Sequence, residues 1–581
     1  EASVGHIRDL PKSNLGIDVD DNFAAEYHVS PNSTKTVKTL KAALKNADEL
    51  LIATDPDREG EAIAWHIVDE LKPKVPIKRL VFNEITKTAI LEALNNTRDI
   101  DLNLVDAQET RRFLDRLFGF MVSKTMWTNM KGGVSAGRVQ SPAVKILVDR
   151  EKERTQFKQN EYWSLSGEFK NNGGTIHSKL IKIGENKLAT GNSFNKKTGT
   201  LFNSNDIILN KNTANDLIEK IKKDDWKIDK LETKPNTQKP YPPFITSTLQ
   251  QEGIRQFRMS AQNVMRIAQS LYENGYITYM RTDSVHLSTE AISASRNEIQ
   301  SLYGNQYLPN TAIQYSSKVK NAQEAHEAIR PAGSKFKHPD TLKNKLNVDE
   351  LKLYKLIWKR TLASQMKSAK IERTTVWITN KNHIFEAKGK VVVFPGFLKV
   401  YVEGADNKKD KDDNEIILPE VKMNEKLKCI QLEPKQHLTK PINRFTEASL
   451  VKELEKLGIG RPSTYAAILK KIQDKEYVNK VKGAMIPTFT GYAIIQFLEK
   501  YFDDLVNLTY TSNMEDNLDS ISRGENSKAE YLKIFYFGNE KIAGLKAKLE
   551  QEFDKNNARL ITLIKDEDKN VEIRIGRYGI Y

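Results

Sequence analysis

A tyrosine and an arginine two residues apart have the chemistry needed for phosphoryl transfer. They are Tyr279 and Arg281, within the stretch from Gly275 to Ser284. A phenol with its ordinary pKa of about 10 is a poor nucleophile at neutral pH, so attack on phosphate requires a fixed cation that neutralises the developing charge. Arg281 could be that cation. The alternative is a β-rich stretch in which Tyr276, Ile277 and Tyr279 fill a core.

Three carboxylates, Asp55, Asp57 and Glu59, lie between an apolar stretch at 50–54, which predicts a buried strand, and a helical stretch at 61–71. Ligands of α/β domains bind at the carboxyl ends of strands, and carboxylate oxygens are the ligands that Mg²⁺ prefers. The alternative is an acidic cap on the helix N-terminus, which the helix dipole favours. One carboxylate is enough for a cap, and the repulsion among three favours a bound cation.

Two segments that combine glycine, serine and arginine have the composition of phosphate cradles. The first, 135–141, leads into a helix, so its backbone amides could bind phosphate together with Arg138 and Gln140. The second, 458–464, lies between two predicted helices in a helix-turn-helix-like arrangement. Two such cradles favour a protein that follows a nucleic-acid backbone.

Two further motifs have a plain structural alternative. Arg111 and Asp115 share one helical face, which fits a solvated salt bridge as well as DNA binding. His326 lies in a helical pattern, where a lone histidine is usually a hydrogen-bonded core or surface residue. No Ser/His/Asp order or H-E-x-x-H motif is convincing. The sequence contains no G-x-x-x-x-G-K-[ST] loop, so ATP use is not indicated.

The composition favours a polyanionic partner in the cytosol. Lys and Arg total 91 against 76 Asp and Glu, which gives a net charge of +15 and favours nucleic acid, although a compositional bias toward Lys would have the same effect. The single cysteine, Cys429, excludes a disulfide framework and a Cys-rich zinc site within these residues. No apolar run approaches the ~18 residues of a membrane span, and the first residues lack a secretory signal.

The elements that must position these residues form several lobes, since 581 residues exceed a single core. An α/β unit is followed by Arg-rich helices from about Asp101 to Thr155 and by strands from Tyr162. A proline-rich linker is expected at 234–243, before a helical lobe that holds Tyr279. Strands return near Thr374 and helices after Phe445. The strands before and after the tyrosine lobe could therefore belong to one sheet domain, and the two helical regions to one helical domain. The sequence alone does not decide either pairing.

Together these motifs resemble the type IA DNA topoisomerases. The matching stretches are Ser3 to Pro11, Ala53 to Glu61, Phe82 to Thr86, Arg111 to Arg116, Ser135 to Ser141, Gly275 to Ser284, His326 to Pro331, Gly458 to Tyr465 and Met514 to Asp519. They span nearly the whole chain. Met280, between the tyrosine and the arginine, is similar to the bacterial topoisomerase I branch, whereas topoisomerase III and reverse gyrase usually carry proline there.

The resemblance implies a multi-domain α/β plus α+β fold, with an N-terminal Toprim α/β domain and three lobes that close a toroidal core. The implied boundaries are 1–100 for the Toprim domain, 101–158 with 441–560 for a helical DNA-binding lobe, 159–240 with 370–440 for a strand-rich gate or arch lobe, 241–369 for the tyrosine lobe, and 561–581 for the start of a C-terminal DNA-binding ribbon. The family's first strand carries V-E-S-P-x-K, and this chain starts downstream of it. We therefore expect an incomplete Toprim domain and a shortened C-terminal tail.

The implied function is transient cleavage of one DNA strand through a 5′-phosphotyrosyl link to Tyr279, followed by strand passage and religation. Arg281 would hold the phosphate, and Asp55, Asp57 and Glu59 would bind Mg²⁺. The implied DNA contacts are His6, Arg111, Arg112, Asp115, Ser135, Gly137, Arg138, Gln140, Ser141, His326, Arg461 and Thr464. The expected substrate is single-stranded and negatively supercoiled DNA, which a cytoplasmic, nucleoid-associated monomer would relax without a nucleotide cofactor or a membrane.

Three alternatives remain from the residues. A topoisomerase III-like decatenase belongs to the same superfamily. A Toprim metal-dependent nuclease or primase would use the three carboxylates but leaves Tyr279 without a role. A non-catalytic single-stranded DNA-binding protein would explain the charge and the cradles but not the crowded carboxylates.

Overall fold

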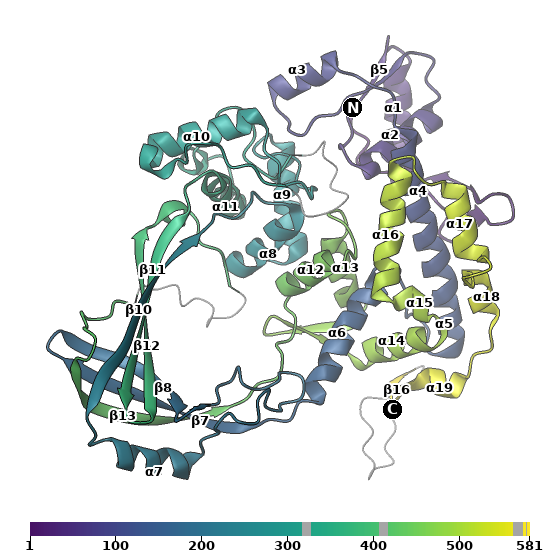
Figure 1. The fold of residues 1–581 in the computed structure, drawn as a ribbon. Coiled ribbons are helices and arrows are strands. Elements are labelled where there is room, and N and C mark those ends of the chain that lie inside the picture. The colour runs from purple at the N-terminus through teal and green to yellow at the C-terminus, as the bar shows by residue number, and fades with distance from the viewer. Residues whose placement is uncertain (317–326, 406–415, 562–572, 577) are drawn as a thin grey trace.

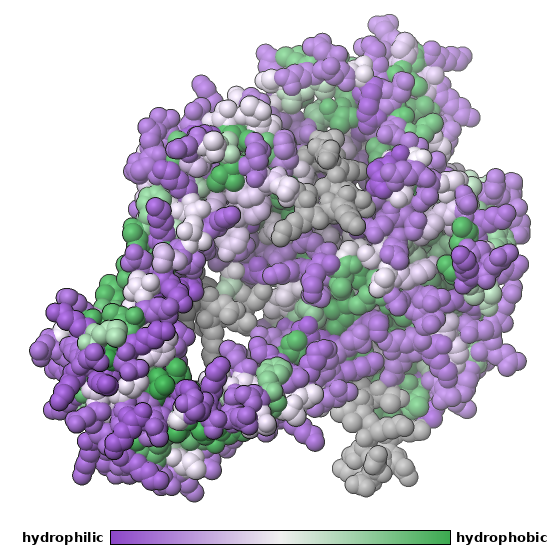
Figure 2. All heavy atoms as spheres, in the orientation of Figure 1, coloured by the Kyte–Doolittle hydropathy of each residue, from purple (hydrophilic) through white to green (hydrophobic). Residues whose placement is uncertain are grey.

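The computed structural model describes residues 1–316, 327–405, 416–561, 573–576 and 578–581. The chain forms four lobes around an opening (Figure 1), and each lobe has its own hydrophobic cluster. The opening between the sheet lobe and the helical lobe is also visible when all heavy atoms are drawn (Figure 2). Within the described residues, no helix is long and apolar enough to cross a membrane.

The N-terminal domain contains a parallel β-α-β unit. Strand β5 (Leu50–Ile52) pairs with β6 (Ile77–Arg79), and helix α2 (Arg58–Leu71) connects them. The other elements here are β1 (Arg8–Asp9), β2 (Ile17–Asp18), β3 (Ala24–Ala25), β4 (His28–Val29), η1 (Pro31–Ser33), α1 (Thr34–Leu44) and α3 (Lys87–Asn95). The parallel order places the turn after β5 at the edge of the sheet that faces the tyrosine lobe.

The helical lobe is built from two segments far apart in the sequence that share one core. The first contains α4 (Leu102–Arg116), the π-helix η2 (Leu117–Val122), α5 (Ser123–Asn129) and α6 (Gln140–Thr155). The second contains α12 (Glu447–Lys456), α13 (Tyr465–Asp474), β14 (Val478–Val481), β15 (Ala484–Pro487), α14 (Phe489–Tyr501), α15 (Asp503–Val506), α16 (Leu508–Ser522), α17 (Lys528–Phe537), α18 (Leu545–Glu550) and α19 (Lys555–Arg559). Strands β16 (Leu560–Ile561), β17 (Ile573–Gly576) and β18 (Gly579–Ile580) end the chain.

The sheet lobe is a seven-stranded antiparallel sheet in the order β12-β11-β10-β13-β7-β8-β9. Its strands are β7 (Glu161–Asn171), β8 (Gly174–Ile183), β9 (Asn186–Lys187), β10 (Trp226–Gln238), β11 (Ala369–Asn380), β12 (His383–Phe394) and β13 (Lys426–Leu438), with helix α7 (Lys211–Ile221) beside them. Strands β8 and β12 also pair, which closes the sheet on itself. The rings of Phe169, Trp226 and Phe385 fill the interior, with centroids 5.0 to 5.3 Å apart.

The expected linker at 234–243 is wrong in its first half. Strand β10 continues to Gln238, and Pro235 pairs in register with Glu372 of β11. On its other side β10 pairs with β13 only at Trp226 and Lys227. Proline is tolerated at such an edge because its missing N–H leaves no ladder bond unmade.

The tyrosine lobe contains α8 (Thr246–Phe257), α9 (Ala261–Glu273), α10 (Thr289–Tyr303), η3 (Asn305–Tyr307), η4 (Pro339–Leu342), α11 (Val348–Ser364) and η5 (Gly396–Lys399). The stretch after α9 forms no continuous strand. It is extended and makes an isolated bridge between Ile277 and Pro331, and the Thr278 amide donates to the Arg330 carbonyl at 2.9 Å. These contacts hold the segment that carries Tyr279 on the face toward the N-terminal domain.

Candidate active site

Tyr279 joins the tyrosine lobe to the N-terminal domain. Its amide donates to the carbonyl of Asn83 at 2.7 Å, and its hydroxyl donates to Oδ2 of Asp57 at 2.8 Å. Oδ2 of Asp55 lies 3.4 Å from the same hydroxyl. The ring is 3% exposed and packs edge-on against Tyr272. The tyrosine is therefore both a core residue and the point where two acidic side chains converge.

The surroundings of Tyr279 keep its hydroxyl protonated. Burial first, and then the carboxylate of Asp57, raise the pKa of Tyr279 well above its usual value. Arg281 acts in the opposite direction, with its Nη1 atom 3.6 Å from Oδ2 of Asp57. About a third of the Arg281 side chain is exposed, at 32%, so the guanidinium can meet a ligand from solvent.

The three predicted metal ligands are not gathered into one set. Asp55 and Asp57 face Tyr279, whereas Glu59 accepts a hydrogen bond from His6 at 2.6 Å. In the part of the chain that the structure describes, no group of three or more His, Cys, Asp or Glu side chains is placed to hold a metal ion. Asp57 also caps α2 by accepting from the Gly60 amide at 2.9 Å, so the cap interpretation holds for this residue as well.

The surroundings of Asp55 and Glu59 shift the pKa values of the two carboxyl groups in opposite directions. Burial, and next the neighbouring charge of Asp57, raise the pKa of Asp55. Burial alone would raise the pKa of Glu59, but the hydrogen bond and charge of His6 and the charge of Arg111 lower it to about 2. The two adjacent carboxylates of Asp55 and Asp57 therefore fit a divalent cation, because a cation would offset their mutual repulsion.

A buried arginine that sequence reasoning missed shapes the turn after β5. Arg79 is fully buried and donates to the carbonyls of Ile52, Thr54 and Asp55 at 3.2, 2.9 and 2.8 Å. Its charge is balanced by Glu61, 3.0 Å away. No sequence signal marks this residue except its place at the end of the second parallel strand. It fixes the backbone from which the carboxylates project.

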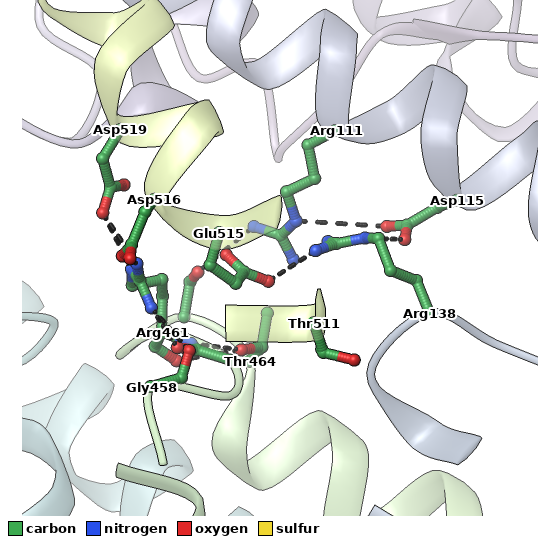
Figure 3. A network of polar contacts seen from close by, with 12 residues as sticks. Arg111, Asp115, Arg138, Gly458, Arg461, Thr464, Thr511, Glu515, Asp516 and Asp519 are labelled. Atoms are coloured by element: carbon green, nitrogen blue, oxygen red, sulfur yellow. Dashed lines mark hydrogen bonds and ion pairs between the residues drawn. The ribbon is translucent and has the colours of Figure 1, made fainter. Parts of the chain in front are cut away.

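The arginine of the first predicted cradle, Arg138, is buried between two carboxylates. This side chain is 2% exposed and pairs with Asp115 at 2.9 Å and with Glu515 of α16 at 2.5 Å (Figure 3). Burial alone would raise the pKa of Glu515, but Arg138 and Arg461 lower it to about 2. Arg138 thus holds Asp115 and Glu515 together inside the lobe, and its direct contact with a phosphate stays a prediction.

The second cradle is held by its own turn. Arg461 donates to the carbonyls of Gly458 and Gly460 at 3.1 and 2.9 Å and to Oδ2 of Asp519 at 2.8 Å (Figure 3). The Arg461 amide donates to the hydroxyl oxygen of Thr464 at 2.8 Å. Hydrogen bonds within the turn therefore stabilise it, and Arg461 already pairs with Asp519.

Most of the remaining predicted DNA contacts form hydrogen bonds within the protein. Arg112 forms a two-pronged bond to Asp9 at 2.7 Å, and Arg111 lies 3.4 Å from the Ser463 hydroxyl. The Ser135 amide donates to Tyr477, the Gly137 amide donates to Ser141, and Gln140 is half-buried beside Gly137. His326 lies outside the described residues.

A cleft of about 1710 Å³ opens beside the turn after β5. Its walls come from residues 1–6, from α1, β5 and α2, and from α9 and α13, and it reaches Asp55, Glu59 and Arg281. The other basic side chains along it are Arg266, Lys470, Lys471 and Lys475. The cleft thus leads from the second cradle to the carboxylates and the arginine beside Tyr279.

Comparison with known proteins identifies the family. The DNA topoisomerase family model matches residues 99–533, and the Toprim domain model matches residues 1–85. The DNA topoisomerase 1 of Synechococcus elongatus is 47% identical over all of this chain and 67% of its own length, and that of Mycobacterium tuberculosis H37Rv is 43% identical over all of this chain and 67% of its own length.

The chain therefore spans about two thirds of the length of these relatives. The structure of full-length topoisomerase I from Thermotoga maritima superposes with a TM-score of 0.80 at 34% identity, covering 100% of this chain and 91% of that one. These matches confirm the predicted Toprim domain and multi-lobed core. The chain belongs to the type IA DNA topoisomerases, with bacterial DNA topoisomerase I as the branch that its relatives represent.

Proposed function

We propose that this chain cleaves one strand of DNA with Tyr279, keeps the cut end as a phosphotyrosine, passes a strand and reseals the break. The observation that carries the proposal is the hydroxyl of Tyr279, which donates to Asp57 at 2.8 Å while Arg281 lies 3.6 Å from the same carboxylate oxygen. A nucleophile, a proton acceptor and a cation thus meet at one point.

Cleavage exchanges the bond from phosphorus to the 3′ oxygen for a bond from phosphorus to the tyrosine oxygen. The Tyr279 oxygen bonds to phosphorus, the bond from phosphorus to the 3′ oxygen breaks, and the phenolic proton passes toward Asp57. The 3′ oxygen leaves and takes up a proton from water, and the phosphate stays on the tyrosine through its 5′ side. Arg281 stabilises the added negative charge on the phosphate. Resealing reverses these bond changes, so no nucleotide is consumed.

Asp55 and Asp57 would hold Mg²⁺ in this proposal, with Glu59 outside their shared face. The ion would supply positive charge beside the phosphate when bound. Asp57 has two further contacts, because it caps α2 and accepts a hydrogen bond from the hydroxyl of Tyr279. Asp55 adds the second carboxylate.

The cleft is the proposed path of the single strand. Its basic residues from α9 and α13 would contact phosphates, and the second cradle would hold the strand where it enters. His6 lines this path, Arg111 lies 3.4 Å from Ser463 on its wall, and Arg461 precedes Pro462, which also lines it. We expect a monomer that acts on single-stranded and negatively supercoiled DNA, in the cytoplasm where a bacterial chromosome lies.

A covalent adduct tests the proposal. An oligonucleotide labelled at its 3′ end should stay with the protein after denaturation, whereas a 5′ label should leave on a fragment with a free 3′ hydroxyl. Tyr279→Phe should abolish the adduct with nearly unchanged strand affinity, because only the nucleophile is lost. Tyr272→Phe, which changes the buried ring beside it, should keep the adduct.

Other outcomes would replace the proposal. Free cut ends without an adduct would indicate the Toprim nuclease, and intact DNA bound by the protein would indicate a binding protein. An undiminished adduct in Tyr279→Phe would move the nucleophile to another residue.

A further inference from the structure

A single carboxylate of α16 connects the turn that carries the active-site acids with the second cradle. Oδ1 of Asp519 accepts from Nη2 of Arg58 at 2.6 Å, and Oδ2 accepts from Nε and Nη2 of Arg461 at 3.1 and 2.8 Å. The side chain of Asp519 is 10% exposed and that of Arg58 is 14% exposed. Charge-assisted bonds in such a shielded place are strong and directional.

Arg58 has a special position in the sequence. It is the first residue of α2 and lies directly between Asp57 and Glu59. Asp57 divides its oxygens between the Gly60 amide and the hydroxyl of Tyr279. Any rotation of the first turn of α2 would therefore change the distance between Asp57 and Tyr279, and the bond from Arg58 to α16 opposes that rotation.

We propose that Asp519 is a positioning residue for strand cleavage, which pairs Arg58 and Arg461 at once and so fixes the carboxylates of the α2 turn relative to the DNA-binding turn of Arg461. The inference rests on the proposed function. Asp519 touches neither the nucleophile nor the expected path of the phosphate, so it acts only through the two arginines.

Neighbouring carboxylates on α16 show why this role belongs to Asp519. Glu515 pairs with Arg138 inside the helical lobe, which braces that lobe alone. Asp516 is 55% exposed and reaches only Arg461, at 3.2 Å. Figure 3 shows Asp516 and Asp519 on the side of Arg461, whereas Glu515 faces Arg111 and Arg138. Among these three, in the part of the chain that the structure describes, Asp519 alone forms an ion pair with the N-terminal domain.

The matched pair Asp519→Asn and Asp516→Asn tests the proposal. Each removes one charge from the same helix and keeps a similar shape. Asp519→Asn should slow adduct formation by roughly tenfold to a hundredfold, because a misplacement of about 1 Å at a catalytic group has that effect. Its affinity for single-stranded oligonucleotide should change less than about threefold, and Asp516→Asn should match the unmodified chain in both measurements.

A second variant separates positioning from general damage to the fold. Arg58→Gln should reproduce the slow adduct formation, and Arg58→Gln with Asp519→Asn should be no slower than the slower single variant, because both remove the same bond. Arg58→Lys should recover part of the rate. Independent losses in the double variant, a wild-type rate in Asp519→Asn, or a loss confined to oligonucleotide affinity would each overturn the proposal.

Hydrogen exchange distinguishes a failure of this inference from a failure of the proposed function. If the unmodified chain forms no adduct, the proposed function fails, and exchange at the amides of Glu59 and Gly60 then decides the inference. Faster exchange in Asp519→Asn than in Asp516→Asn would support a fixed turn. Equal exchange would overturn it.

Discussion

At the scale of single residues, the active-site turn depends on a glycine. A Cβ on Gly60 would lie 2.1 Å from the carbonyl oxygen of Asp55, so alanine would force the turn apart although it usually favours helix. We predict that Gly60→Ala abolishes most adduct formation and lowers the melting temperature. Gly119→Ala is the control, since its Cβ would meet only the Ala136 carbonyl at an ordinary 3.8 Å. An active Gly60→Ala would show that the turn tolerates displacement.

At the scale of elements, the buried pair of Glu515 and Arg138 attaches α16 to the segment before α6 and, through Asp115, to α4. Glu515→Gln should reduce stability at pH 7 by on the order of 3 kcal/mol, because Arg138 keeps its charge with less compensation. The pKa of Glu515 is lowered to about 2 in the folded chain, so its contribution is present above the ordinary pKa and is lost as pH falls toward 2.

Urea unfolding at pH 7 and pH 3 checks this sign. The difference in the free energy of unfolding between the unmodified chain and Glu515→Gln should be smaller at pH 3 than at pH 7. Asp516→Asn should have nearly the same free energy of unfolding as the unmodified chain at both pH values. A constant difference at both pH values would mean that packing, and not the charge of Glu515, attaches the helix.

At the scale of the whole molecule, the tyrosine lobe must separate from the N-terminal domain before a strand can pass through the break. An ion pair crosses that contact, because Nη1 of Arg330 lies 3.0 Å from Oε2 of Glu84, which also accepts from the Gly333 amide at 3.0 Å. Glu84→Gln removes the charge and should increase the open fraction about fivefold, equivalent to about 1 kcal/mol.

Single-molecule fluorescence transfer between labels on α3 and α10 measures this opening. The native thiol of Cys429 is first replaced by serine so that it takes no label. Glu92→Gln, an exposed change on α3, should leave the open fraction unchanged. An unchanged open fraction in Glu84→Gln would show that other contacts hold the two lobes together.

The sequence by itself determined the family and the chemistry that the residues could perform. Tyr279 with Arg281, and the carboxylates after the first strand, are local patterns whose spacing persists whatever the fold. The strand predicted at 50–54 and the helix predicted at 61–71 are present at 50–52 and 58–71, because apolar runs and helical periodicity depend on near neighbours. The matches to known topoisomerases confirm the family and the fold class.

Only the tertiary structure decided which side chains meet. Arg138 has the sequence context of a phosphate ligand, yet it is buried against Glu515, 377 residues away. Pro235 predicts a linker, but an unpaired strand edge admits it into β10. Asp519 accepts a hydrogen bond from Arg58, which lies 461 residues away in the sequence. Local periodicity carries no information on such contacts, because burial and charge pairing between distant segments are set by how whole lobes pack.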